Sequence, residues 1–101
     1  MKPGDLELAF KALADSTRLR ILDILKKPGK SACGLIEKNE RGLCACDIQD
    51  AIGLSQAATS HHMELLRRAR LVKAEKRGRW MFYRRNEPEI AALARKLAKA
   101  V

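Results

Sequence analysis

The sequence lacks the features that define several common classes of protein. It has no apolar run of membrane length and no signal-peptide pattern, so we expect a cytoplasmic protein with no membrane partner. It has three cysteines, and this odd number argues against a disulfide framework and favours metal binding or redox sensing. It has neither a Ser-His-acid set nor a phosphate-binding loop, so we expect no enzymatic activity.

Acidic residues are scarce relative to basic ones. The chain has 12 Asp and Glu against 21 Lys and Arg, which gives a net charge of +9 over 101 residues. That much positive charge on a small protein favours a polyanionic partner, and nucleic acid is the common one. A hydrophobic content of 47% is sufficient for a folded core, and the length predicts a single domain over residues 1–101.

The segment from Leu43 to Leu71 organises the rest of the chain. It predicts two helices separated by Gly53, because glycine readily adopts the left-handed conformation that ends a helix. Ser55 follows where its hydroxyl can cap the second helix. This layout, over residues 47–69, is that of a helix-turn-helix, which presents its second helix to DNA.

The second of these helices has one apolar and one polar face at 100° per residue. Gln56 and Ser60 lie on the polar face in the first two turns, where recognition helices contact base edges, although any surface helix has such a face. His62 is expected in the core, whereas His61 lies at the edge and can reach a phosphate. The predicted apolar face consists of Ala58, His62, Leu65, Leu66 and Ala69.

The rest of the chain predicts further helices and one β-hairpin. Helices are expected at 5–14, after the capping residues 15–17, and at 87–99, and a hairpin with a basic tip is expected at 71–85. The fold class is therefore mainly α with a small β-hairpin, a winged helix-turn-helix of about five helices. The first and last helices each have an apolar stripe, and this excess apolar surface suggests a homodimer.

These patterns define candidate DNA contacts on the helix-turn-helix and the wing. Arginines at the hairpin tip suit phosphates or the minor groove, although charge at a loop tip can also be merely solvated. The full set is Ser55, Gln56, Thr59, Ser60, His61, Arg67, Arg77 and Arg79.

The chain contains four distinctive segments: FKALADSTRLRIL (10–22), LCACDI (43–48), GLSQAATSHHMELLRRARLV (53–72) and WMFYRR (80–85). These segments and the order of the predicted elements resemble the arsenic-repressor (ArsR/SmtB) family of winged-helix metalloregulators. The resemblance covers nearly the whole chain except residues 30–42, which form a longer connection than is usual. It implies a homodimeric repressor that leaves double-stranded operator DNA when an inducer binds.

The same resemblance implies the inducer. In this family a pattern like LCVCDL marks an arsenic or antimony site, so Cys44 and Cys46 are the implied ligands of As(III) or Sb(III), or of a soft divalent metal. Some members carry a third cysteine where this chain has Gln49. Cys33 is the only other thiol, and we expect it to complete the site. Gly42 is expected to begin a short strand just before the cysteine pair.

Other interpretations of the cysteines stay open. Cys44 and Cys46 would point about 200° apart on a regular helix, so they can share one ion only where the segment is not yet helical. They can also be two inert, buried thiols. A repressor of the same fold that senses oxidants or persulfides is the main alternative. A thiol oxidoreductase is more remote, because such enzymes normally have a βαβ context that the sequence lacks.

Overall fold

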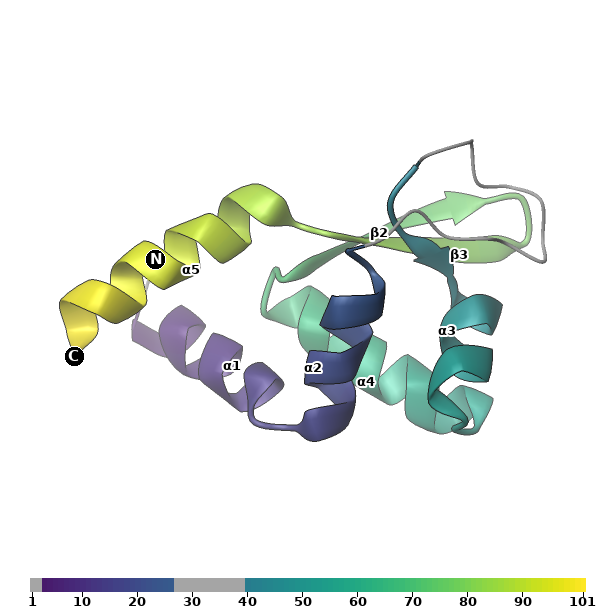
Figure 1. The fold of residues 1–101 in the computed structure, drawn as a ribbon, viewed down its shortest axis with the longest axis horizontal. Coiled ribbons are helices and arrows are strands. Elements are labelled where there is room, and N and C mark those ends of the chain that lie inside the picture. The colour runs from purple at the N-terminus through teal and green to yellow at the C-terminus, as the bar shows by residue number, and fades with distance from the viewer. Residues whose placement is uncertain (1–2, 27–39) are drawn as a thin grey trace.

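The computed structural model describes residues 3–26 and 40–101 (Figure 1). Within these ranges the chain forms five helices and a small antiparallel sheet, which confirms the mainly helical winged helix-turn-helix. Cys33 lies outside the described residues. The elements are α1 (Pro3–Leu13), α2 (Ser16–Ile24), β1 (Leu43–Cys44), α3 (Ala45–Ile52), α4 (Gln56–Arg68), β2 (Val72–Arg77), β3 (Trp80–Arg85) and α5 (Glu87–Ala100).

The hairpin is part of a three-stranded sheet with the order β1-β3-β2. Its turn is two residues long, Gly78 and Arg79, because β2 extends to Arg77, which pairs with Trp80. Gly78 adopts a φ of 60° in this turn, as such tight hairpin connections require. On the other edge of β3, the short strand β1 pairs Leu43 with Tyr83 and Cys44 with Phe82.

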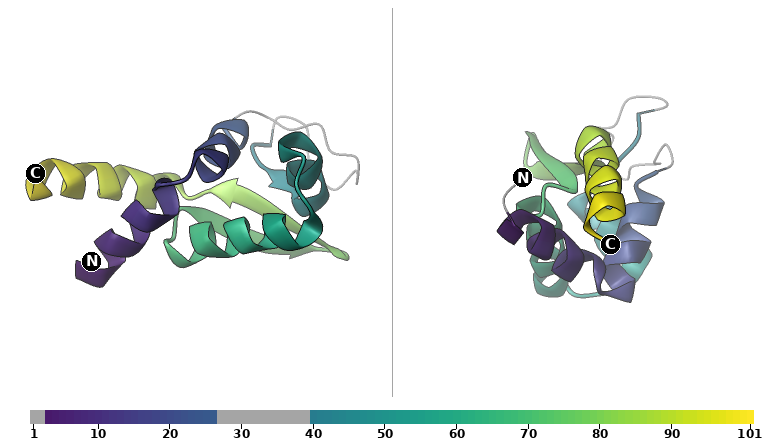
Figure 2. Two further views of the ribbon diagram at one scale, coloured as in Figure 1. Left: turned by 90° about the horizontal axis from the view of Figure 1, so that it is seen from below. Right: turned by 90° about the vertical axis from the view of Figure 1, so that its left-hand side faces the viewer.

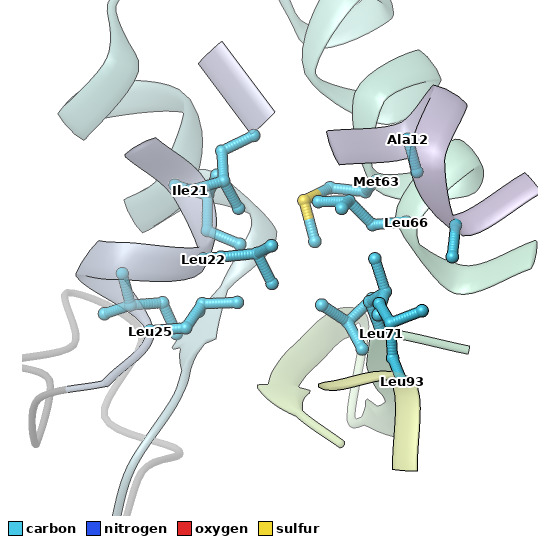
Figure 3. Packing of buried hydrophobic residues seen from close by; sticks show 12 residues of the cluster. Ala12, Ile21, Leu22, Leu25, Met63, Leu66, Leu71 and Leu93 are labelled. Carbon is cyan, nitrogen blue, oxygen red and sulfur yellow. The ribbon is translucent and has the colours of Figure 1, made fainter. Parts of the chain in front are cut away.

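The hydrophobic core lies between α2 and α4 and extends to the base of the sheet and to α5 (Figure 3). Ile21 and Leu22 of α2, and Leu25 at its C-cap, point toward Met63 and Leu66 of α4. The buried cluster consists of Ala9, Ala12, Ile21, Leu22, Leu25, Leu43, Ile48, Met63, Leu66, Leu71, Val72 and Leu93.

The inward face of α4 differs from the predicted one. Its buried residues are Thr59, Met63 and Leu66, whereas His62 is only half-buried. Helix α4 packs against α1, α2, α3 and β2 at once, so tertiary packing rather than hydropathy alone selects its buried face.

The turn between α3 and α4 has the predicted conformation. Gly53 is left-handed, with a φ of 70°, and its backbone N–H donates to the carbonyl oxygen of Gln49 at 2.9 Å. The Ser55 hydroxyl accepts from the backbone N–H of Ala58 at 3.1 Å. The turn and the N-cap predicted from sequence are both confirmed.

Helices α1 and α5 lie at the same end of the molecule, and the hairpin turn lies at the other end (Figure 2). Both helices retain exposed apolar side chains, namely Leu8 and Phe10 on α1 and Leu97 on α5. No helix within residues 3–26 and 40–101 is long and apolar enough to cross a membrane.

Gly42 allows β1 to lie against β3. Its φ is 132°, and a β-carbon built there would lie 2.6 Å from both Cζ of Phe82 and the carbonyl oxygen of Tyr83. These contacts are closer than real β-carbons tolerate, so only glycine fits without a shift of the sheet.

Gly42→Ala should therefore lower the free energy of unfolding much more than Gly53→Ala. Both changes place a β-carbon at positive φ, which costs about 1–2 kcal/mol. Nothing lies within 4 Å of a β-carbon at Gly53, whereas the clash at Gly42 should add about 1–3 kcal/mol. Urea unfolding at one fixed protein concentration measures the difference. Equal losses in the two variants would contradict the close approach at Gly42.

Candidate functional site

The N-terminal turns of α4 and the turn of the hairpin border one groove. The groove has a volume of about 230 Å³ and lies between the start of α3, the first two turns of α4, and β3. Gln56 and Ser60 line it from the exposed face of α4, and Arg79 and Trp80 line it from the hairpin. It thus brings together amide, hydroxyl and guanidinium groups, which all bond to DNA bases and phosphates.

The remaining predicted contacts on α4 have different environments. Ser55 and His61 are exposed at or near the start of the helix. Arg67 is also exposed, but its guanidinium donates to both carboxylate oxygens of Glu64, at 3.0 and 2.6 Å. This pairing raises the pKa of Arg67 and lowers the pKa of Glu64. Arg67 therefore has a partner in its own helix before DNA is present.

Thr59 was predicted as a DNA contact, and the structure corrects this. Its side chain is 3% exposed and its hydroxyl donates to the carbonyl oxygen of Ser55 at 2.8 Å. A threonine on a helix can bond back to the carbonyl four residues earlier, which satisfies its hydroxyl inside the core. Thr59 therefore borders the groove with almost no exposed surface, and its hydroxyl is already bonded within its own helix.

Arg77 was predicted to contact DNA from the wing tip, and the structure gives it partners within the protein. Its guanidinium makes a bidentate ion pair with Glu40, at 2.6 and 2.7 Å, and a further contact to Glu75 at 2.9 Å. It also lies 3.8 Å from the centre of the Phe82 ring. The Glu40 carboxylate is the main cause of a strongly raised pKa for Arg77, whose side chain is only 18% exposed. By contrast Arg79, in the turn itself, is exposed and has no carboxylate partner among the described residues.

One arginine of α2 joins α1 to the recognition helix. The Arg18 guanidinium donates to the carbonyl oxygens of Ala12 and Lys11, at 2.6 and 3.2 Å, and lies 3.0 Å from Nδ1 of His62. Because arginine can only donate, Nδ1 of His62 is the acceptor. The predicted core histidine is thus a half-buried residue with a polar partner, which fixes α4 relative to α1 and α2.

The two cysteines lie on either side of a strand-to-helix boundary. Cys44 ends β1 and is the N-cap residue of α3, with extended backbone and a fully buried side chain. Cys46 lies in the first helical turn, is half-buried and lines the groove. The segment is therefore not regular helix at Cys44, and the helix dipole at this end favours thiolates. The described part of the chain contains no cluster of three or more His, Cys, Asp or Glu side chains that could hold a metal.

The three-helix arrangement of α2, α3 and α4 with an adjoining β-hairpin defines a winged helix-turn-helix DNA-binding protein. Residues 35–74 match the family described as "Bacterial regulatory protein, arsR family". The chain is similar to the arsenical resistance operon repressor of Bacillus subtilis, with 33% identity over 86% of this chain and 71% of the repressor. It is also similar to a homolog of the cadmium resistance regulator CadC from Staphylococcus aureus, with 32% identity over 93% of this chain and 68% of that protein.

A solved structure shows the same fold. A solution structure from Mycobacterium bovis, described as a homodimeric winged helix-turn-helix DNA-binding domain, superposes with a TM-score of 0.69 at 24% identity, covering 96% of this chain and 79% of that one. The chain therefore belongs to the arsR family of transcriptional regulators, which bind DNA and are not enzymes.

The capping of α2 should make stability depend on pH in the acid range. Asp15 accepts from the backbone N–H of Arg18 at 3.0 Å, and this bond lowers the pKa of the Asp15 carboxyl in the folded state. A lowered folded pKa means that the stabilisation is fully present above the ordinary carboxyl pKa of 3.8 and is lost as pH falls through the lowered pKa. Asp15→Asn should therefore unfold at lower urea than wild type near pH 7, and the gap should shrink near pH 3. A gap independent of pH would show that charge on Asp15 is not involved.

Proposed function

We propose that the protein represses transcription as a homodimer bound to operator DNA and leaves the DNA when As(III) or Sb(III) binds Cys44 and Cys46. A soft divalent metal is the second inducer candidate. The observation that carries this proposal is the position of the cysteine pair at the start of α3, the helix that supports the recognition helix. Relatives named for arsenical and for cadmium resistance both support thiophilic ions as the inducer class.

The homodimer rests on the apolar surfaces of α1 and α5. These two helices lie at one end of the protein and expose Leu8, Phe10 and Leu97 to water. A two-fold axis at this end would bury them between the two subunits. Half-sites about one helical turn apart, in a near-palindrome, match such a dimer.

Release follows from the geometry of the motif. When one ion binds both thiols, we expect residues 44–46 to shift, because Cys44 is buried while Cys46 lines the groove. The displacement would reach Gln56 through α3 and Gly53. Such coupling is reciprocal, so DNA must weaken ion binding by the same factor, typically about 5–150-fold.

Thiol oxidation or persulfidation is the alternative signal. Cys46 lines a groove that is open to solvent, which is the exposure that a reactive thiol needs. Release of DNA by an oxidant and its reversal by a dithiol reductant, without metalloid, would favour this alternative.

DNA binding should depend steeply on salt. The dimer carries a charge of +18, from +9 on each of two chains. With about six to ten phosphate contacts, affinity should fall about 10³–10⁵-fold between 50 and 200 mM salt, as measured by fluorescence anisotropy. Arg79→Ala should flatten this slope, whereas Gln56→Ala should relax sequence preference with little change in slope. A slope near zero for wild type would refute binding through the phosphate backbone.

Cys44→Ser and Cys46→Ser should each give a repressor that binds DNA as wild type does but stays bound when arsenite is added. Cys33→Ser tests the expected third ligand and should weaken the response without changing DNA affinity. X-ray absorption should find three sulfur neighbours around arsenic in wild type and two in Cys33→Ser. Ion binding should also weaken at low pH because it displaces thiol protons. If arsenite releases the Cys44 and Cys46 variants as readily as wild type, the inducer site lies elsewhere.

A further inference from the structure

The ion pair between Glu40 and Arg77 joins the two outer strands of the wing across the middle one. Glu40 lies three residues before β1, on one edge of β3, and Arg77 is the last residue of β2, on the other edge. The guanidinium passes over the Phe82 ring on β3 to reach both carboxylate oxygens of Glu40. A bidentate pair with a cation–π contact fixes direction as well as distance.

The placement of this ion pair makes it a support for the hairpin turn. Arg77 is the residue immediately before the turn formed by Gly78 and Arg79. Within residues 40–101, β1 contributes two residues to pairing with β3, and residues 41 and 42 before it form only bridges, so the ladder at this edge of the sheet is short. The side chains of Glu40 and Arg77 are 24% and 18% exposed, and such partly buried charges are screened less by salt than surface pairs.

We propose that Glu40 and Arg77 are positioning residues for DNA binding. Their ion pair fixes the wing turn, which includes Arg79, in the position from which the turn contacts DNA beside α4. Arg77 does not contact phosphate in this arrangement. Glu40 and Glu75 together carry one more negative charge than Arg77 neutralises, so this group of three presents no net positive charge to DNA. The proposal concerns DNA binding and stands apart from the identity of the inducer.

The sign of the Glu40→Gln effect gives the first test. Removing a carboxylate from a DNA-binding surface should by simple electrostatics strengthen binding. The positioning role predicts the opposite: Glu40→Gln should weaken operator binding about 5–30-fold in low salt. Glu75→Gln is the matched control, since it removes the same charge from the same arginine but leaves the link across the sheet. It should leave affinity within about twofold of wild type.

A second pair of variants separates positioning from phosphate contact. Arg77→Lys keeps the charge but loses the bidentate fork, so it should bind DNA nearly as weakly as Arg77→Gln. Arg79→Lys should retain most of its affinity, because a lysine still binds a phosphate. The log–log salt slope should fall by about two in an Arg79→Gln dimer, and it should stay unchanged in Glu40→Gln and Arg77→Gln.

The single tryptophan reports on the wing directly. Trp80 pairs with Arg77 in the sheet and is half-exposed. In the absence of DNA, its fluorescence anisotropy should fall in Glu40→Gln and Arg77→Lys. It should not fall in Arg79→Gln. Glu40 lies outside the buried cluster, so we expect Glu40→Gln to fold. This variant tests the proposal even if the Arg77 variants fail to fold. Unchanged or tighter DNA binding by Glu40→Gln, or full affinity in Arg77→Lys, would overturn the proposal. Failure of arsenite to release wild type would refute the proposed inducer and leave these outcomes unaffected.

Discussion

The pairing of β1 with β3 is the contact on which the arrangement of the site depends. It lasts for two residue pairs, yet it places Cys44 opposite Phe82 at the centre of the sheet and starts α3 in a fixed direction. Gly42 permits this approach, since a β-carbon there would overlap Phe82 and the Tyr83 backbone. Because the cysteine pair begins in this strand, the thiols are attached on one side to the wing and on the other to the helix that supports α4.

The recognition helix α4 packs against the core with one face and exposes polar side chains on the other. Thr59, Met63 and Leu66 bury one side against α1, α2, α3 and β2, and Gln56 and Ser60 remain exposed on the other. A helix held on so many sides cannot rotate without repacking the core. A signal from the cysteines must therefore move α4 together with its neighbours or through Gly53, where the backbone has conformational freedom that other residues lack.

Most of the local structure was predictable, because its causes lie within a few residues. The helical periodicity, the left-handed Gly53, the Ser55 cap and the basic hairpin are all signals of this kind. The role of Arg77 was not predictable in the same way. Strand alternation does place it on the same face as Glu75, but its main partner Glu40 lies 37 residues away and meets it only through the β1–β3 pairing. Thr59 was misassigned because a polar residue counts as exposed by hydropathy, although its hydroxyl finds a carbonyl within its own helix.

The net charge of +9 overstates how many individual basic side chains are available to contact DNA. Carboxylates have already engaged several arginines: Glu64 pairs with Arg67, and Glu40 and Glu75 pair with Arg77. These pairs still contribute to the long-range attraction of the whole molecule, which depends on the sum of charges. Short-range contact to a phosphate requires a cation without such a competitor, and Arg79 at the wing turn meets that condition among the described residues. The acidic residues of this basic protein thus determine which of its arginines stabilise the wing and which are available to contact DNA phosphates.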